Sequence, residues 1–356
     1  MQKIFWLIVV VALAGGGWLA WALLTPATPF AQTFVLLRPG TSTRRIAAEL
    51  KKDGIIRSED AFILWHFLHR GRSLKAGEYL FEKPANAIEV QKRLARGDVY
   101  LRTVVVPEGF TMFDIARAVE AAGLGPADEF LKVAQSDTAL IADIAPTAKS
   151  LEGYLFPDTY EFSRMMTMRE MAAAMVKQFR QVAKQIGLIQ TSSDESASPL
   201  PHIRVELRIS GHDPNAPRSD LERTVILASI IEKETAVPGE RPLVASVYDN
   251  RLQKKIALDA DPSIIYAELL AGTYTGALHH DDMRFSSPFN TYTHTGLPPG
   301  PIANPGKSSL EAAMHPAPSD YYYFVADAQG HHRFARTIEE HNKNVAAYRK
   351  AMRQQQ

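Results

Sequence analysis

The N-terminal segment constrains the fold of this chain more than any other part of the sequence. Residues Ile4 to Leu24 carry no charge, and about 20 apolar residues in a helix span the hydrocarbon core of a bilayer. Three tryptophans lie near the two ends of the segment, where indole rings favour the membrane interface. Lys3 and the amino terminus place positive charge on the N-terminal side of this segment, which favours a cytoplasmic location for that side. We therefore predict a cytoplasmic tip and transmembrane anchor over residues 1–25, with the remaining chain outside the cytoplasm.

A cleaved signal peptide is the alternative interpretation of the same segment. Signal peptides usually have an apolar core of roughly 7 to 15 residues, followed by a cleavage site with small residues. The stretch TPATPFAQ, residues 25–32, matches such a site poorly. The sequence thus favours a single-pass anchor in the inner (cytoplasmic) membrane, with an extracytoplasmic or periplasmic main body.

The composition excludes several classes of function. The chain has 356 residues, of which 46% are hydrophobic and 22% charged, and its net charge is +1. Such a chain can form about two domains with hydrophobic cores. It has no strong positive electrostatic field that would attract nucleic acid. The absence of cysteine excludes disulfides, thiol catalysis and Cys-ligated zinc.

Neither a metal nor a cofactor is predicted. The adjacent pairs His279-His280 and His331-His332 invite a metal site, but neighbouring residues of a regular element point in different directions. The zinc-protease spacing HExxH does not occur, and neither does a P-loop or a dinucleotide fingerprint.

Two segments align without a gap at an offset of 69 residues. GTSTRRIAAELKKDGI begins at Gly40 and GFTMFDIARAVEAAGL begins at Gly109. Each follows a short apolar stretch, contains a hydroxyl residue suited to cap a helix, and closes with a glycine suited to end one. The pattern predicts a strand, a tight turn, an amphipathic helix and a glycine stop over residues 33–57 and again over 102–126.

This repeat resembles the LysM-type carbohydrate-binding module. The resemblance implies binding of glycan chains that contain N-acetylglucosamine, within a membrane-proximal region over residues 30–148. A plain structural repeat is the alternative, because strand–turn–helix units are common.

A buried helix that ends in charged residues is predicted from Ser219 onward. Ser219 and Glu222 form a capping box, and VILASII is apolar on all sides. Near the C-terminal end, Glu232 shares a face with Leu221, Val225 and Ala228, whereas Glu234 lies on the opposite face. Apolar packing and the negative end of the helix dipole both raise a carboxyl pKa, as a general acid requires. A structural ion pair with Arg or Lys is the alternative, and periodicity does not choose between Glu232 and Glu234.

A resemblance to a known family chooses between the two glutamates. ASIIEKETAVPGERPLVASVYDNRL resembles the central segment of the endolytic murein transglycosylases, the YceG-like family. EGYLFPDTYEF precedes it; LDADPSIIY, SPFNTYTHTGLPPGPIANPG, SLEAAMHPAPSDYYYFVAD and HRFARTIEEHN follow in order. The resemblance implies an α+β fold with a transmembrane helix, a LysM-like region and a catalytic domain over residues 149–350. It also implies that Glu232 is the catalytic acid.

The chain departs from this family at two places. The family commonly reads LQTDPT where this chain has LDADPS, so that Asp259 replaces an amide and any role of that amide is in doubt. A polar stretch at about residues 191–220 is interpreted as an insertion, to which the sequence assigns no function.

Five further residues are candidates for substrate binding. The loop that begins at Ser287 is rich in Pro and Gly and is expected to be irregular and rigid. Its polar side chains and its tyrosine could bind sugar hydroxyls and acetamides, and an Asp-Pro pair precedes the loop in the chain: Asp261, Ser287, Asn290, Thr291 and Tyr292. A loop held together by its own Asx and Ser turns is the alternative.

The resemblance implies non-hydrolytic cleavage of the bond between N-acetylmuramic acid (MurNAc) and N-acetylglucosamine (GlcNAc) in nascent peptidoglycan. Glu232 would act as both acid and base and leave 1,6-anhydro-MurNAc ends, in cell wall assembly and glycan-strand termination. Expected partners are the glycan strands, the membrane and peptidoglycan synthases. Two alternatives stay open: a non-catalytic glycan-binding scaffold, and a hydrolytic muramidase that uses Glu232 and Asp261 with water.

Overall fold

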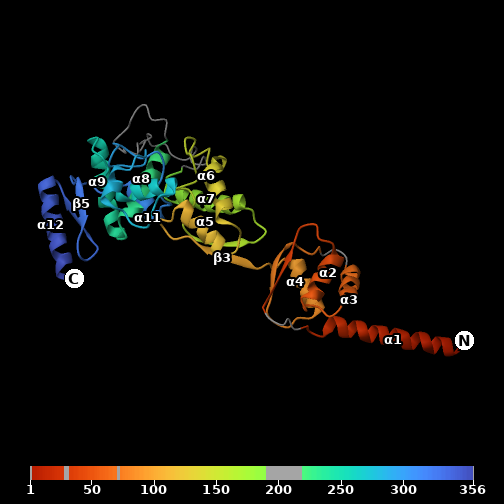
Figure 1. The fold of residues 1–356 in the computed structure, drawn as a ribbon. Helices are drawn as coiled ribbons and strands as arrows, with labels where there is room; N and C mark the ends of the chain where they lie inside the picture. Colours follow the sequence, from red (N-terminus) through yellow and green to blue (C-terminus); the bar gives the residue numbers. More distant parts are fainter. Residues whose placement is uncertain (1, 28–31, 70–72, 190–218, 356) are drawn as a thin grey trace, which may run out of the picture. The chain divides into compact units, whose positions relative to one another are not determined.

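The computed structural model describes residues 2–27, 32–69, 73–189 and 219–355, which Figure 1 shows as a ribbon. The chain forms two compact units. The first consists of residues 1–103, 122–124 and 161–167, and the second of residues 104–121, 125–160 and 168–356. Helices and short two-stranded sheets are combined in both, as predicted for an α+β protein. The interpretation of residues 191–220 as an insertion falls, up to residue 218, outside the described residues.

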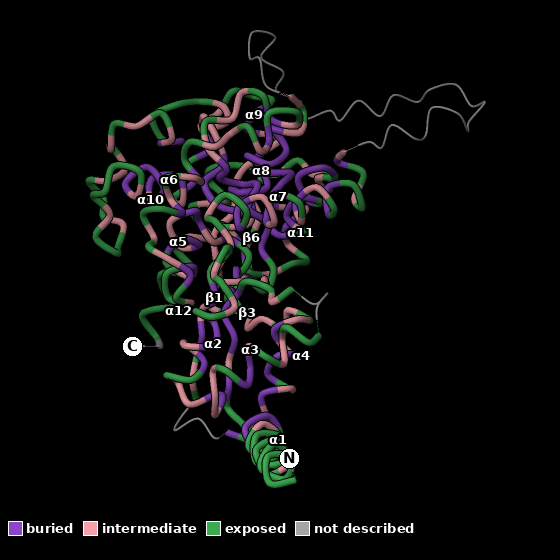
Figure 2. Tube along the Cα trace, turned by 90° about the vertical axis from the view of Figure 1, so that its right-hand side faces the viewer, coloured by how far each residue is buried: buried purple, intermediate pink, exposed green. Residues whose placement is uncertain are grey.

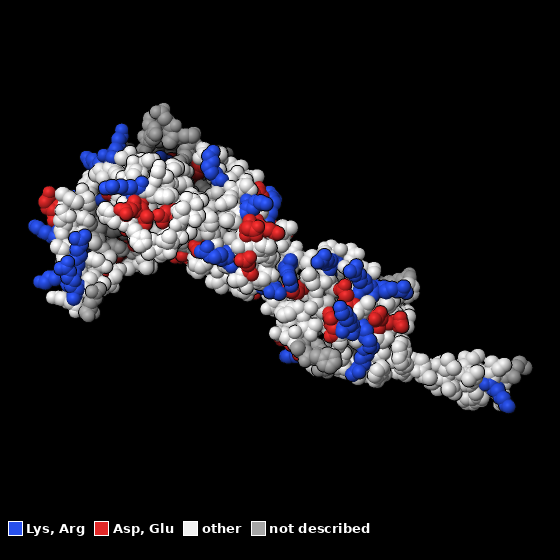
Figure 3. Space-filling model, in the orientation of Figure 1, with Lys and Arg blue, Asp and Glu red and all other residues white. Residues whose placement is uncertain are grey.

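Helix α1 (Gln2–Leu24) confirms the apolar helix predicted at the N-terminus. It is long and apolar enough to cross a membrane, with a mean hydropathy of 2.2. Lys3 is the only charged residue of this helix, and Figure 3 shows a basic group near its N-terminal end. Most of its large apolar side chains are exposed. The helix is compatible with a single-pass membrane anchor, and a signal sequence would share its length and composition.

The first unit is built on one antiparallel strand pair. Strand β1 (Thr33–Leu37) pairs with β2 (Gly77–Phe81), with Thr33 opposite Phe81. Helices α2 (Thr43–Lys52) and α3 (Glu59–Leu68) connect the two strands, and α4 (Ala87–Arg96) follows. One apolar core joins these elements, with fully buried side chains that include Leu50, Phe62, Tyr79 and Leu94.

Both predicted strand–turn–helix segments are present. The first copy is β1 followed by α2, and the second is β3 (Leu101–Val105) followed by α5 (Met112–Ala121). The turn glycines Gly40 and Gly109 both have φ of +78°, and the stop glycines Gly54 and Gly123 have φ of +71° and +70°. These values lie in the left-handed region that glycine adopts without strain. The repeat at an offset of 69 residues is therefore a repeat of backbone conformation.

The two copies differ in their strand partners. Strand β1 pairs with β2, whereas β3 pairs with β4 (Thr159–Ser163). The division between the compact units passes through β3 and β4. Residue 149, the predicted start of the catalytic domain, lies inside the second unit, because α5, α6 (Ala127–Ser136) and α7 (Met168–Gln185) pack together there.

Helix α8 (Asp220–Glu234) lies at the centre of the second unit. It packs against α9 (Arg241–Gln253), α10 (Asp261–Ala271) and α11 (Lys307–Met314), and Figure 2 shows buried residues concentrated around it. The predicted capping box is confirmed: the Glu222 amide donates to Ser219 Oγ at 3.2 Å, and the Ser219 amide donates to Glu222 Oε2 at 2.8 Å. This cap fixes where α8 begins, and thereby which residues reach its far end.

The remaining elements of the second unit are short. Three 3₁₀ turns are η1 (Thr138–Leu140), η2 (Pro238–Glu240) and η3 (His280–Arg284). Near the C-terminus, β5 (Tyr323–Ala326) and β6 (His332–Ala335) form an antiparallel hairpin, against which α12 (Ile338–Gln355) packs.

Candidate active site

The candidate site is centred on Glu232, near the C-terminal end of α8. Only 4% of its side chain is exposed. Its Oε1 accepts a hydrogen bond from Arg241 Nη2 at 2.8 Å, and its Oε2 accepts one from the Gly306 amide at 2.9 Å. Arg241 is the first residue of α9, and Gly306 is the N-cap of α11, where the helix dipole favours an anion. Three helix ends therefore meet at one carboxylate.

The turn after β3 closes another side of the site. Gly109 has φ of +78°, and a Cβ at that position would lie 3.4 Å from Glu232 Cγ. Lys233 Nζ donates to the Gly109 carbonyl at 3.2 Å, and the Gly109 amide donates to the Asn304 carbonyl at 2.9 Å. The turn thus lies against the Glu232 side chain, and its left-handed φ favours glycine at this position.

A buried pair, Glu152 and Asn304, holds the two segments that surround Glu232. Glu152 Oε1 accepts from Asn304 Nδ2 at 2.7 Å, and both of its oxygens accept from the Met112 amide, at 3.1 and 3.0 Å. Asn304 Oδ1 accepts from the amides of Gly153 and Leu155 at 2.8 and 2.9 Å. The pair thus joins the start of α5 to the segment that leads into Gly306.

Burial raises the pKa of Glu152 to about 8, and the hydrogen bonds from the Met112 amide and the Tyr266 hydroxyl offset only part of that effect. No cation takes part in these contacts. A buried carboxyl without a cationic partner favours its neutral form.

The second glutamate of this helix end, Glu234, has different neighbours. Its hydrogen bond with Tyr248 and its electrostatic interactions with Arg251 and Asp261 agree with the prediction that Glu232 and Glu234 lie on different faces of α8. Part of the residue remains accessible to solvent. Burial of its carboxyl nevertheless raises the pKa to about 7, aided by the negative charge of Asp261 and opposed by a hydrogen bond from Tyr248. The raised pKa expected at this helix end is thus present at Glu234.

Two of the five predicted substrate residues lie together at the surface. Asp261 is the first residue of α10, and its Oδ1 accepts a hydrogen bond from the Tyr292 hydroxyl. Tyr292 is 37% exposed. The pair brings a ring and a carboxylate together where a ligand could reach them.

The other predicted residues form the loop itself. Asn290 is fully buried; its Nδ2 donates to the Met283 and Phe285 carbonyls, and its Oδ1 accepts from the Tyr292 amide. Thr291, 2% exposed, accepts from the Ala260 amide at 3.0 Å. The half-buried Ser287 accepts from the Phe289 amide at 3.2 Å. These contacts match the alternative of a loop held by its own turns, and in this conformation Asn290 and Thr291 have no surface for a substrate.

Asp259, where the resemblance leads one to expect an amide, has an unusual backbone. Its φ is +52°, a value several-fold enriched in Asp and Asn among residues other than glycine. Its Oδ2 lies 2.9 Å from Arg251 Nη1, and the same guanidinium donates to the carbonyls of Ala257, Leu258 and Tyr322. A carboxylate at position 259 therefore gains an ion pair with Arg251 that a neutral amide would lack.

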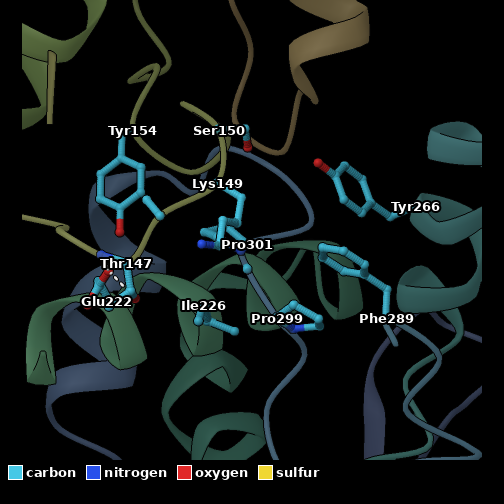
Figure 4. A pocket seen from close by; sticks show the side chains of 12 residues that line it. Thr147, Lys149, Ser150, Tyr154, Glu222, Ile226, Tyr266, Phe289, Pro299 and Pro301 are labelled. Atoms are coloured by element: carbon cyan, nitrogen blue, oxygen red, sulfur yellow. Dashed lines mark hydrogen bonds between the residues drawn. The ribbon is translucent and has the colours of Figure 1, made fainter. Parts of the chain in front are cut away.

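A small cavity lies beside the N-terminal half of α8 (Figure 4). Its volume is about 90 Å³, and apolar groups dominate its lining, including Tyr154, Ile226, Tyr266, Phe289, Pro299 and Pro301. At its edge, Glu222 accepts hydrogen bonds from the Thr147 amide and hydroxyl at 2.9 and 2.7 Å. Glu222 precedes Glu232 by about 15 Å along the helix axis, at about 1.5 Å per residue. The cavity is thus separate from the Glu232 carboxylate.

The histidine pairs take part in other contacts. His331 and His332 each place Nδ1 against a Glu240 oxygen, at 3.0 and 2.7 Å. Within the described ranges, no group of three or more His, Cys, Asp or Glu side chains is arranged to hold a metal ion.

The sequence analysis missed most of the partners of Glu232. Glu108, Glu152, Arg241 and Asn304 were not singled out, because hydrophobic periodicity carries no information about contacts between distant segments. One signal was available at Glu108: the repeat aligns it with Pro39, so the second copy has a charged residue immediately before its turn glycine.

These features define a class of site: a nearly buried carboxylate, held by an arginine and a backbone amide, inside an α+β domain. The model of the YceG-like family matches residues 35–347, so the chain belongs to the YceG-like family.

Named relatives cover most of the chain. It is 32% identical over 345 residues to the endolytic murein transglycosylase of Bacillus subtilis, across 92% of this chain and 88% of that protein. It is 27% identical over 338 residues to the endolytic murein transglycosylase of Streptococcus pneumoniae strain D39, across 87% of this chain and 57% of that protein. The crystal structure of a putative YceG-like protein from Listeria monocytogenes superimposes with a TM-score of 0.52 at 29% identity, across 88% of this chain and 98% of that one.

Proposed function

We propose that this protein is a membrane-anchored endolytic murein transglycosylase. It cleaves the MurNAc–GlcNAc bond within nascent peptidoglycan strands and leaves 1,6-anhydro-MurNAc ends. Family membership and the names of the relatives support this activity. The observation that carries the mechanism is the environment of Glu232, whose side chain is 4% exposed and bonded through both oxygens.

One carboxyl group is sufficient for both proton transfers. Glu232 in its protonated form gives its proton to the glycosidic oxygen, and the bond from that oxygen to C1 of MurNAc breaks. An oxocarbenium-like sugar results, as in other glycosidic cleavages. The Glu232 carboxylate then takes the proton of the C6 hydroxyl while O6 forms a bond to C1. The step consumes no water, and Glu232 is again protonated at its end.

The partners of Glu232 favour its deprotonated state, which exists between the two proton transfers. Hydrogen bonds from a guanidinium or a backbone amide are strongest to a charged carboxylate. Arg241 and the Gly306 amide therefore stabilise the anion that remains after Glu232 has given up its proton. They also fix the direction in which its oxygens point.

The substrate-binding roles divide between two groups of residues. Tyr292 and Asp261 are accessible and suit contact with the sugar, and the half-buried Ser287 lies in the same loop as Tyr292. Asn290 and Thr291 act indirectly, because their side chains hold the loop that carries Tyr292.

Helix α1 and the names of the relatives support the proposed location and glycan substrate. The chain is anchored in the inner membrane with its N-terminus in the cytoplasm, and the catalytic region over residues 149–350 lies outside the cytoplasm. The LysM-like segments 33–57 and 102–126 bind the glycan, and peptidoglycan synthases supply the nascent strands.

The test is mass spectrometry of purified glycan strands after incubation with the full-length protein in detergent. Wild type should produce anhydro-ended fragments, and Glu232→Gln should reduce them by about 10² to 10⁴-fold, which is the usual contribution of proton transfer. Glu311→Gln is the control, because this half-exposed carboxylate on α11 pairs with Lys307 at 3.7 Å.

Other outcomes would replace the proposal. Ends heavier by about 18 mass units, the mass of one water, would indicate a hydrolytic muramidase, with Asp261 as its second carboxylate. Intact strands that remain bound to wild type would indicate a glycan-binding scaffold.

A further inference from the structure

A second carboxylate, Glu108, lies beside the proposed catalytic residue. Arg241 Nη2, which donates to Glu232 Oε1 at 2.8 Å, is also 3.4 Å from Glu108 Oε2. About half of the Glu108 side chain is exposed, whereas the Glu232 side chain is nearly buried. Glu108 immediately precedes Gly109 in the turn after β3. One guanidinium nitrogen is thus shared by two carboxylates from distant parts of the sequence.

Gly306 provides a second point at which the two carboxylates meet. Its amide donates to Glu232 Oε2 at 2.9 Å, and a Cβ at this position would lie 1.9 Å from Glu108 Oε1. Its φ of −76° is open to any residue, so a larger residue here would have to displace the flexible end of the Glu108 side chain. Both carboxylates therefore contact Arg241 and Gly306.

Arg241 needs a negative partner at all times. Its side chain is 7% exposed, and its Nε has no hydrogen-bond partner among the described residues. An arginine keeps its charge at every pH at which proteins are stable, and a buried charge without a partner is strongly destabilising. During the proposed reaction, however, Glu232 must be neutral when it approaches the substrate.

We propose that Glu108 is a positioning residue that takes over the ion pair with Arg241 whenever Glu232 carries a proton. This inference rests on the proposed function of Glu232. Arg241 lies nearer to Glu232 than to Glu108, at 2.8 and 3.4 Å, which is the arrangement expected when Glu232 is charged. When Glu232 is neutral, Arg241 turns to Glu108, and its charge remains paired.

Other carboxylates nearby have partners of their own, since Glu240 binds His331 and His332 and Glu234 accepts a hydrogen bond from Tyr248. Lys233, on the same helix, is a cation and donates to the Gly109 carbonyl. On α11, Lys307 pairs with Glu311.

Under this proposal, Glu108 and Arg241 both control how readily Glu232 holds its proton, and they act in opposite directions. The negative charge of Glu108 favours protonated Glu232, and the positive charge of Arg241 opposes it.

The experiment measures kcat for anhydro-end formation from about pH 4 to pH 9, with the full-length protein in detergent. Activity should fall on the alkaline side as Glu232 loses its proton. Glu108→Gln should move this alkaline fall in kcat about one pH unit toward lower pH, as the loss of a nearby charge typically does. At acid pH its kcat should return to the wild-type value, and KM should change little. Glu108→Asp, which keeps the charge, should stay near wild type, and so should Glu311→Gln. Arg241→Gln should move the alkaline fall in kcat toward higher pH. If that variant does not fold, Arg241→Lys replaces it, and the fall should then not move toward lower pH.

The opposite directions of the two shifts distinguish this role from a structural one. An equal loss of kcat at every pH for Glu108→Gln would overturn the proposal in favour of simple packing. An increase in KM alone would overturn it in favour of a substrate contact. In both cases the proposed function would stand, because wild type still produces anhydro ends. If wild type produces none, both the function and this role of Glu108 are overturned.

Discussion

The two strand–turn–helix copies share a backbone conformation and differ in what they bring to the site. Their turn glycines, Gly40 and Gly109, have the same φ of +78°. The first copy has Pro39 before its glycine, and the second has Glu108, whose carboxylate reaches Arg241. The surroundings of the glycines differ too. A Cβ on Gly109 would contact Glu232, whereas one on Gly40 would meet open space among the described residues. The same local fold thus has a structural role in one copy and a place beside Glu232 in the other.

The largest effect that separates the copies is expected from alanine at the two turn glycines. Both substitutions introduce a side chain at positive φ, which costs about 1 kcal/mol of unfolding free energy. In Gly109→Ala, relief of this strain should shift the turn, whose carbonyl and amide bond Lys233 and Asn304, and lower kcat about a hundredfold, as small displacements near reacting groups do. Gly40→Ala should leave kcat within about twofold of wild type. Steady-state assays of anhydro-end formation measure this difference, and equal loss of kcat in both variants would remove the distinction between the copies.

A second prediction compares buried carboxyls in the two units, Glu78 and Glu152, each 1% exposed. Burial acts to raise the pKa of Glu78, but hydrogen bonds from Arg102 and Arg164 outweigh it and the pKa is lowered. The pKa of Glu152 is raised by burial to about 8. The stability that Glu152 contributes is therefore full below its unfolded pKa and is lost as the pH rises through about 8. The contribution of Glu78 is lost as the pH falls through its lowered pKa.

Glu152→Gln should thus reduce the pH dependence of stability. Between pH 5 and pH 8.5, the free energy of unfolding of wild type should fall relative to that of Glu152→Gln by more than about 1 kcal/mol. Chemical denaturation of the full chain at both pH values checks this. Glu78→Gln is the matched control, and its free energy of unfolding should fall between these pH values as much as that of wild type. Parallel behaviour of wild type and Glu152→Gln would contradict the burial of Glu152 as a neutral group.

The smallest effects are expected at the helix caps of the two copies. Ser42 Oγ accepts from the Arg45 amide at 3.4 Å. Thr111 Oγ1 accepts from the Asp114 amide at 3.2 Å and donates to Asp114 Oδ2 at 2.7 Å. Ser42→Ala should cost about 0.5 kcal/mol and Thr111→Ala about 1 kcal/mol, within the usual range for such caps. Thermal unfolding measures both losses; a larger loss for Ser42→Ala would show that the additional Asp114 bond contributes nothing.

Local sequence patterns predicted the elements well. The capping box at Ser219, the left-handed glycines of both repeats and the separate faces of Glu232 and Glu234 depend on interactions within a few residues or on helix periodicity. The contacts around Glu232 could not be predicted in this way. Glu108 and Arg241 come from other elements, and which charged side chains meet at Glu232 is decided by how the helices pack. The polar loop after Ser287 shows the same limit, since its residue types suit either sugar binding or internal turns.

Asn304 has a consequence for how the protein folds. Its side chain uses its full hydrogen-bonding capacity, donating to Phe110 and Glu152 and accepting from Gly153 and Leu155. These contacts connect residues separated by about 150 to 190 positions in the chain, and contacts of such long range form slowly because long loops must first be closed. The surroundings of Glu232 are complete only after these contacts have formed. A partly folded chain would therefore hold the glutamate without its partners. Under the proposed function, glycan strands would be cut only by molecules that had finished folding.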